Sequence, residues 1–260
     1  MNIIALSILA GVIGMGLGAL LSALFGTKTD KMTSILLSFA GGVMMSIVFL
    51  ELIPESFELS GVAVSIIGLV LGALLVFALN NLMDKLSSKR KGSTLHESFA
   101  DHFHSNEIIS RKSTMLRSGM IMLFAIGLHN VPEGLAMGAA GHYDASLGLA
   151  LALIIGLHNI PEGMAVSAPL IVGGISKAKA IVITACAGAT TVLGAFVGVL
   201  VGGISDVAVA ISFSIAGGAM LYVVIGEMIP QSIIMSKDRI PTVFTLIGII
   251  VGMLFIHLVY

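Results

Sequence analysis

The chain has 260 residues, of which 57% are hydrophobic and only 10% are charged, and its formal net charge is -1. A soluble domain carries about a quarter charged residues, so this composition excludes an ordinary water-exposed surface. The balanced charge excludes a nucleic-acid partner, because no excess of basic residues is present to neutralise phosphates. The single cysteine, Cys186, lies in an apolar run, which excludes a disulfide framework and a cysteine-based zinc site.

Long apolar runs separated by short polar breaks predict an all-α integral membrane protein, because a membrane-spanning helix needs about 20 apolar residues. The first run follows no basic segment and precedes no clear cleavage site, so we interpret it as a span and not as a signal peptide. Strands of a β-barrel would alternate in short segments, whereas these runs are continuous. In chain order the eight predicted spans are residues 3–25, 32–54, 62–83, 115–140, 146–172, 178–203, 207–232 and 241–260.

The 13 basic residues all fall in alternate connections or within three residues of their ends, namely the connections between spans 1 and 2, 3 and 4, 5 and 6, and 7 and 8. A miscounted span would scatter them over both sides of the membrane. Since basic loops stay in the cytoplasm, this pattern predicts both termini outside. We therefore expect a multi-pass protein of the cell membrane, that is, of the inner or cytoplasmic membrane.

We expect residues 1–260 to form a single transmembrane domain, with one long cytoplasmic loop at residues 84–114. This loop contains His96, Glu97, Asp101, His102 and His104. Short histidine-rich tracts bind metal in some proteins, so two interpretations stay open, a solvated linker and weak metal capture.

Two segments of the chain are repeated. IGLHNVPEGLA at 126–136 recurs as IGLHNIPEGMA at 155–165, and AGGVMMSIVFLELIPES at 40–56 recurs as AGGAMLYVVIGEMIPQS at 216–232. The second offset also places span 1 over span 6 and span 3 over span 8. Because matching spans cross the membrane in opposite directions, the sequence predicts a 3+2+3 inverted repeat, an arrangement that transporters commonly use.

The repeated HNxPEG segments carry the chemistry. His129 and Glu133 are four residues apart and share one helix face, and Pro132 removes a backbone donor and favours a kink. Ionisable groups inside a membrane are costly and normally have a partner. Imidazole, amide and carboxylate donors without sulfur suit Zn, Fe, Mn, Co or Ni better than Ca, Mg or Cu(I). The candidate metal ligands are His129, Asn130, Glu133, His158, Asn159 and Glu162.

A second pair of carboxylates, Glu51 and Glu227, lies near span ends, each three residues before a proline. Two interpretations stay open for each glutamate: a role on the metal path, or a carboxylate at a helix end that reaches the membrane interface.

The paired HNxPEG helices, the eight spans, the 3+2+3 repeat and the histidine-bearing loop resemble the ZIP (Zrt-, Irt-like protein) family of zinc and iron transporters, in its short bacterial and archaeal form. The resemblance implies uptake of divalent metal into the cytoplasm, zinc first, with iron, manganese, cadmium and cobalt as further candidates. It implies a transporter and not an enzyme, with the metal as substrate and no bound cofactor. It also implies alternating access, in which spans 1, 4, 5 and 6 move against the others, and a homodimer.

By matching motif positions, the resemblance implies ligand roles for the six HNxPEG residues and places Glu51 and Glu227 on the path. One departure concerns span 6, where many relatives carry a carboxylate in an E-P-L-G stretch and this chain has Thr191. A two-metal centre would then lack one of its charged ligands.

Two other functions compete with this interpretation. An intramembrane metalloprotease requires HExxH, but Asn130 and Asn159 occupy the position of its glutamate. A proton-coupled carrier of small organic solutes would use His and Glu as a relay, yet it would not need two asparagine-bearing copies of one ligand set.

Overall fold

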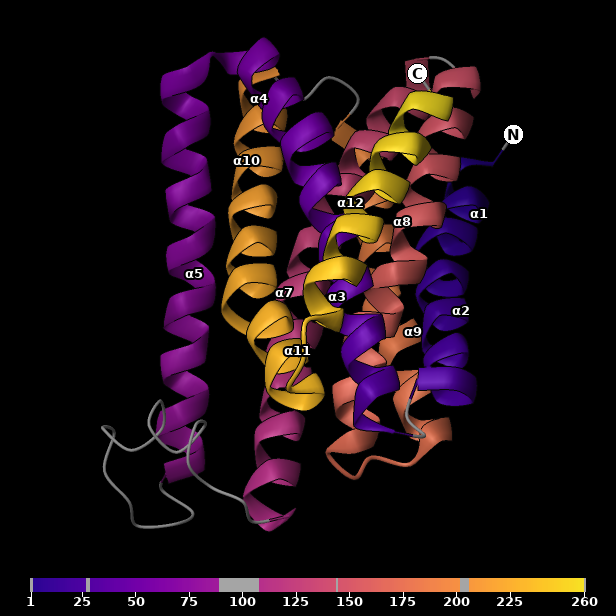
Figure 1. The fold of residues 1–260 in the computed structure, drawn as a ribbon. Helices are drawn as coiled ribbons and strands as arrows, with labels where there is room; N and C mark the ends of the chain where they lie inside the picture. Colours follow the sequence, from indigo (N-terminus) through magenta and orange to yellow (C-terminus); the bar gives the residue numbers. More distant parts are fainter. Residues whose placement is uncertain (1, 27–28, 89–107, 144, 202–205, 260) are drawn as a thin grey trace.

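The computed structural model describes all residues except 1, 27–28, 89–107, 144, 202–205 and 260, and every element in the described part is a helix. Eight helical stretches are long and apolar enough to cross a membrane, which confirms the predicted count. They run side by side as a bundle, and the first helix begins at the end of the bundle where the last one finishes (Figure 1). The chain is a multi-pass membrane protein.

Five spans are continuous α-helices and three contain π-helical turns. The continuous spans 3, 4, 5, 6 and 8 are α5 (Val62–Ser88), α7 (Ile108–Tyr143), α8 (Ala145–Val172), α9 (Lys177–Val201) and α12 (Ile240–Val259). Span 1 comprises α1 (Ile3–Ser7), a π-helical turn (Ile8–Ile13), α2 (Gly14–Leu21) and a second π-helical turn (Ser22–Gly26). Span 2 comprises α3 (Asp30–Ile47), a π-helical turn (Val48–Leu52) and α4 (Ile53–Ser60), and span 7 comprises α10 (Asp206–Val223), a π-helical turn (Val224–Met228) and α11 (Ile229–Ser236).

Several spans are longer than predicted. Span 2 was expected to end at Pro54 but continues to Ser60, because the proline lies in the first turn of α4, where a missing N–H is tolerated. Pro230 has the same position in α11. Helices α5 and α7 extend into both ends of the predicted 84–114 loop. The histidines of that loop lie outside the described residues, so its metal-capture role stays a prediction.

Glycines bring pairs of helices into backbone contact. A Cβ atom on Gly42 of α3 would lie 2.1 Å from the carbonyl oxygen of Thr245 in α12, and one on Gly218 of α10 would lie 2.0 Å from that of Leu69 in α5. The offset that relates Gly42 to Gly218 also relates Leu69 to Thr245. The two contacts are therefore equivalent under the predicted repeat.

The remaining spans form a second equivalent pair. A Cβ atom on Gly18 of α2 would lie 2.0 Å from the carbonyl oxygen of Ile160 in α8, and one on Gly194 of α9 would lie 2.1 Å from that of Val131 in α7. Small residues allow membrane helices to approach this closely, and any larger side chain at these positions would separate the backbones.

These contacts divide the bundle into two packing units. Every described glycine whose added Cβ would meet another helix within 4 Å meets one from the same unit. We call spans 1, 4, 5 and 6 the motif unit, because they include both HNxPEG segments, and spans 2, 3, 7 and 8 the flanking unit. Larger side chains such as Leu37, Met44, Met122 and Ile126 fill the core that the two units share. The family resemblance names the same two groups of spans, and their movement against each other stays a prediction.

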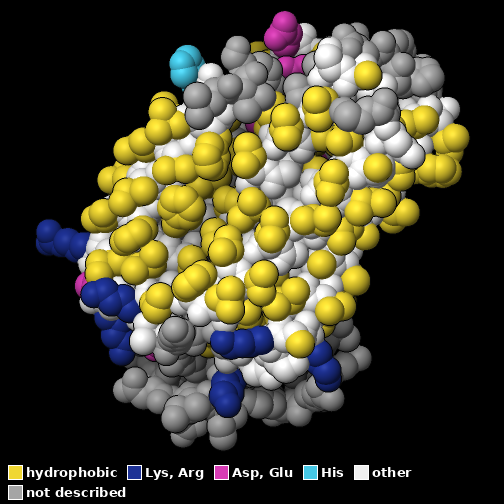
Figure 2. Space-filling model, turned by 90° about the vertical axis from the view of Figure 1, so that its right-hand side faces the viewer, with side chains coloured by type: hydrophobic (Ala, Val, Ile, Leu, Met, Phe, Trp, Pro, Cys, Tyr) yellow, Lys and Arg dark blue, Asp and Glu magenta, His cyan; other side chains and the backbone are white. Residues whose placement is uncertain are grey.

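The outer surface suits a lipid environment. On the face in Figure 2, apolar side chains cover the middle of the molecule and Lys and Arg side chains gather toward one end. Exposed apolar side chains are frequent on the outermost helices, among them Leu71, Leu74, Leu193, Leu200 and Ile250. The side of the membrane on which the termini lie remains a prediction.

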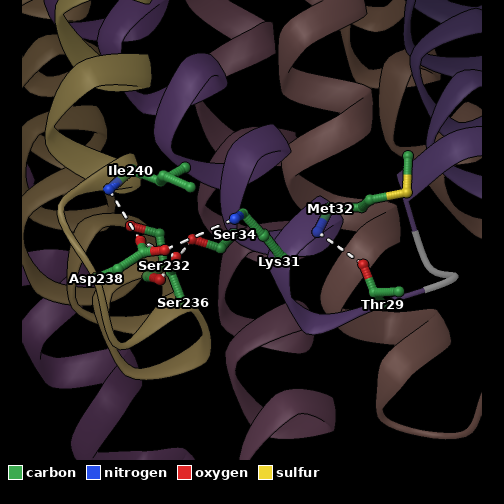
Figure 3. Close-up of polar contacts among 8 residues, drawn as sticks. All are labelled: Thr29, Lys31, Met32, Ser34, Ser232, Ser236, Asp238 and Ile240. Carbon is green, nitrogen blue, oxygen red and sulfur yellow. Dashed lines mark hydrogen bonds and ion pairs between the residues drawn. The ribbon is translucent and has the colours of Figure 1, made fainter.

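Polar contacts connect spans 2, 7 and 8 at one end of the flanking unit (Figure 3). The Ser34 hydroxyl of α3 donates to the carbonyl oxygen of Ser232 in α11 at 2.6 Å. Between α11 and α12, a hydrogen bond from Ser236 holds the pKa of the Asp238 carboxyl below its usual range, helped by the backbone N–H of Ile240 and by Lys31. These contacts fix the start of span 2 against the connection between spans 7 and 8.

Candidate metal centre

The two HNxPEG segments lie in the middle of α7 and α8, and both helices continue through their prolines. Each segment turns its histidine, asparagine and glutamate toward the interior, where these side chains are at most 4% exposed. The six predicted ligands are His129, Asn130, Glu133, His158, Asn159 and Glu162, and all of them are buried. Membrane-embedded ionisable groups normally face such an interior and have a polar partner there.

Glu133 lies at the centre of this set. Its Oε1 atom is 2.7 Å from Nε2 of His158 and 2.9 Å from Nε2 of His129. Oε1 of Glu162 is 3.5 Å from the same nitrogen of His129. Ligand atoms of His129, Glu133 and His158 all lie within 4.8 Å of one another, which is close enough for one ion to contact all three. The structure thus brings both motifs together at one point.

Many polar atoms of this cluster lack a hydrogen-bond partner within the described structure. They are both ring nitrogens of His129, both amide atoms of Asn130, Oε2 of Glu133, Nδ1 of His158, Oδ1 of Asn159 and both carboxylate oxygens of Glu162. Folded proteins pair the great majority of buried polar atoms, because an unpaired one costs about 1–3 kcal/mol. A cation bound between these nitrogen and oxygen donors would satisfy several of them together.

Asn159 is oriented by span 1. Its Nδ2 atom donates to the carbonyl oxygen of Ala10 at 3.0 Å, which leaves Oδ1 as a free acceptor. Ala10 belongs to a π-helical turn, and such turns are frequent at functional sites. Gly14 and Gly156 allow this part of span 1 to approach α8.

Thr191 is fully buried in α9, and its hydroxyl has no hydrogen-bond partner in the described structure. Its carbonyl oxygen would lie 1.9 Å from a Cβ on Gly134, directly after Glu133 in α7. Thr191, at the position where the family resemblance led us to expect a carboxylate, therefore packs against α7 next to Glu133 and brings a neutral side chain.

Glu51 lies in the π-helical turn of span 2, with a buried Oε2 atom that has no hydrogen-bond partner in the described structure. It shares a cleft with His158, so it reaches the cluster from the flanking unit. The other residues that line this cleft are apolar and come from α3, α8 and α12: Val43, Ile47, Ile154, Leu157, Gly252, Phe255 and Ile256.

Glu227 is not part of the cluster. Its carboxylate accepts hydrogen bonds from Asn80 at 3.2 Å and from the hydroxyl of Ser118, and Nη1 of Arg117 lies 3.8 Å away. Asn80 also donates to the hydroxyl of Tyr222 and accepts from Nη2 of Arg117 at 3.0 Å. Sequence reasoning did not identify this polar network and treated Arg117 as a loop charge, whereas the residue lies inside α7.

Comparison with known proteins agrees with this geometry. The model of the ZIP zinc transporter family matches residues 2–259. The chain is 31% identical to the zinc transporter ZupT of Streptococcus mutans, over 96% of this chain and 92% of that protein. It is 32% identical to ZupT of Chlorobium chlorochromatii and 33% identical to ZupT of Akkermansia muciniphila, over at least 96% of this chain and at least 92% of each relative. Neither the protease nor the organic-solute carrier is supported by these relatives. The chain belongs to the ZIP family of zinc transporters.

Proposed function

We propose that this protein carries divalent metal ions, zinc first, across the cell membrane through the buried cluster on α7 and α8. The observation that carries this proposal is the convergence of buried nitrogen and oxygen atoms, many of them without a hydrogen-bond partner in the described structure, on two adjacent membrane-embedded motifs. Imidazole and carboxylate ligands suit zinc, whose structural and catalytic sites use the same donors. The zinc transporter ZupT relatives favour the same substrate.

The proposed primary position combines His129, Glu133 and Glu162. Because Nε2 of His158 is 2.7 Å from Glu133, this imidazole can complete a four-ligand set. Asn130 and Asn159 supply neutral oxygens for a second, weaker position. Since Thr191 brings no charge, we expect one tightly bound ion and not two.

We propose that metal enters through the cleft beside Glu51, which connects the flanking unit to His158. All six ligands belong to α7 and α8 of the motif unit, whose spans are in close backbone contact with one another. A rigid-body movement of one unit against the other would expose the ion to each side in turn without breaking its coordination. Import into the cytoplasm is the direction that the family resemblance favours.

The test is zinc uptake into liposomes that contain the purified protein. Glu133→Ala and Glu162→Ala each remove one buried carboxylate of the cluster, and Glu58→Ala is the matched control, because Glu58 lies outside the cluster in α4. We expect saturable uptake that both cluster variants reduce about 100-fold or more, since even the residues that orient metal ligands contribute about 10- to 100-fold. Competition by cadmium, iron, manganese and magnesium would rank the substrates. Uptake no faster than in protein-free liposomes, from correctly inserted protein, would refute the proposal.

A further inference from the structure

Arg117 joins the two packing units. It lies in α7 of the motif unit, and its guanidinium contacts two residues of the flanking unit, Asn80 in α5 and Glu227 in span 7. The neighbouring Ser118 of α7 donates to the same carboxylate. Glycine contacts, by comparison, stay inside each unit. This network is therefore a polar link across the boundary that has to move during alternating access.

The link is well shielded from water. The side chain of Arg117 is 16% exposed and that of Glu227 is 8% exposed. A planar guanidinium directs its N–H groups to two acceptors at fixed positions, so one arginine can bond Asn80 and face Glu227 together. Removing one member of a buried charge pair is costly, because the other charge is left without a partner.

The equivalent position in the other half of the repeat lacks such a link. The offset that relates Glu51 to Glu227 relates Asn80 to Ile256, an apolar residue of α12. Ile256 and Glu51 line the same cleft, and Oε2 of Glu51 has no hydrogen-bond partner in the described structure. One glutamate of the pair thus borders a cleft, whereas the other is covered by an arginine.

We propose that the Arg117 guanidinium, which lies against the Glu227 carboxylate, takes the place of a metal ion there and locks the two units together. The lock is at the end of the bundle that the positive-inside rule assigns to the cytoplasm. A divalent ion leaving the cluster on that side can use the Glu227 carboxylate only after Arg117 has moved away. Arg117 is thus a positioning residue that keeps the inner side closed while metal binds from the Glu51 side. This inference rests on the proposed transport function.

The test measures how readily water-soluble reagents reach the link. In a Cys186→Ser background, a reporter cysteine is introduced by Ser118→Cys, and its labelling by a membrane-impermeant maleimide is followed in nanodiscs. Ser118 is fully buried, so labelling reports opening of the link. Arg117→Gln should speed labelling about tenfold, the effect of losing one charged hydrogen bond. Lys112→Gln, which removes an exposed charge from the same helix, should leave the rate unchanged.

Two further variants separate a lock from general destabilisation. Arg117→Lys keeps the charge but cannot hold both partners in the same geometry, so its labelling rate should lie between those of the parent and Arg117→Gln. Adding Glu227→Gln to Arg117→Gln should speed labelling no further, because the two residues act as one pair. The equilibrium zinc affinity of Arg117→Gln should stay within about twofold of the parent, whereas a general loosening of the fold would weaken it.

Equal labelling rates in the parent and in Arg117→Gln would overturn the lock. If Arg117→Gln does not fold, the same comparison is made with Arg117→Lys. Labelling requires no metal flux, so the two proposals fail separately. If the parent takes up no zinc but Arg117→Gln is still labelled faster than the parent, only the transport proposal is refuted. If uptake is normal but the two labelling rates are equal, only the lock is refuted.

Discussion

Two sites of this protein each bury a glutamate inside the helix bundle, and they differ in the polar partners that surround its carboxylate. Around Glu133, two histidines, two asparagines and a second glutamate converge, and most of their polar atoms have no hydrogen-bond partner in the described structure. Around Glu227, Asn80, Arg117 and Ser118 bond the carboxylate or lie against it. The first site offers donors that a cation could bind, whereas the second already contains a cation, Arg117. In our two proposals, the first site accepts the substrate and the second holds the closed state.

The sharpest test of this contrast removes the nitrogen ligands. His129→Ala and His158→Ala should each weaken zinc binding about 100-fold, because each deletes a donor beside Glu133. Competition with a chromophoric chelator measures this affinity. As the control, Asn80→Ala disrupts the second site and should leave zinc affinity within about threefold of the parent. Zinc affinity unchanged by both histidine substitutions would place the ion elsewhere.

Matched glutamine substitutions should change stability in different directions. Glu227→Gln removes one buried charge contact of Arg117 and should lower the free energy of unfolding by about 2 kcal/mol. Glu162→Gln removes a buried charge that accepts no hydrogen bond in the described structure and whose ion-pair contact with Nε2 of His129 is long, at 3.5 Å. The metal-free protein should therefore be unchanged or more stable.

Thermal unfolding in nanodiscs with a chelator present measures both effects. Added zinc at about 100 times its dissociation constant should stabilise the parent by about 2.7 kcal/mol. That gain should disappear in Glu162→Gln and persist in Glu227→Gln. Equal destabilisation by the two substitutions without metal would contradict the contrast between the sites.

Acidification should act on the metal cluster. Zinc binds neutral imidazole, so protons compete with the metal for the ring nitrogens of His129 and His158. For each proton displaced, affinity should fall about tenfold per pH unit as the pH drops. Uptake measured between pH 7.5 and 5.5 should therefore decline at low zinc and recover at saturating zinc. A decline that no zinc concentration reverses would point to the fold and not to the cluster.

The smallest expected effect concerns Thr191. Valine has nearly the same shape but no hydroxyl, so Thr191→Val tests whether that oxygen binds the ion. Because a neutral hydroxyl contributes little beside charged ligands, we expect zinc uptake to change about threefold or less. A loss of more than about tenfold would identify Thr191 as a ligand and reopen the two-ion arrangement.

The sequence was sufficient to predict the eight spans and the burial of all six HNxPEG residues. Spans can be recognised in the sequence because the thickness of the bilayer sets how many consecutive apolar residues a helix needs to cross it. The shared face of His129 and Glu133 follows from helical periodicity. Span ends were less accurate: the prediction stopped span 2 at Pro54, although a proline in the first turn of α4 allows the helix to continue.

The Glu227 network could not be predicted in the same way. Asn80, Arg117 and Glu227 come from three different spans, with no motif that relates them. Whether Arg117 faces water or the interior depends on how α7 packs against α5 and span 7, which periodicity within one helix does not encode. The repeat even suggested equal roles for Glu51 and Glu227, because the polar partners that distinguish them lie outside the matching segments.

The most direct measurement of the central claim is X-ray absorption at the zinc edge of the loaded protein. We predict a shell of nitrogen and oxygen atoms at about 2.0–2.2 Å, with imidazole scattering and no sulfur. Imidazole scattering should weaken in His129→Ala and in His158→Ala. A shell with sulfur, or one that neither substitution changes, would contradict binding at the paired HNxPEG helices.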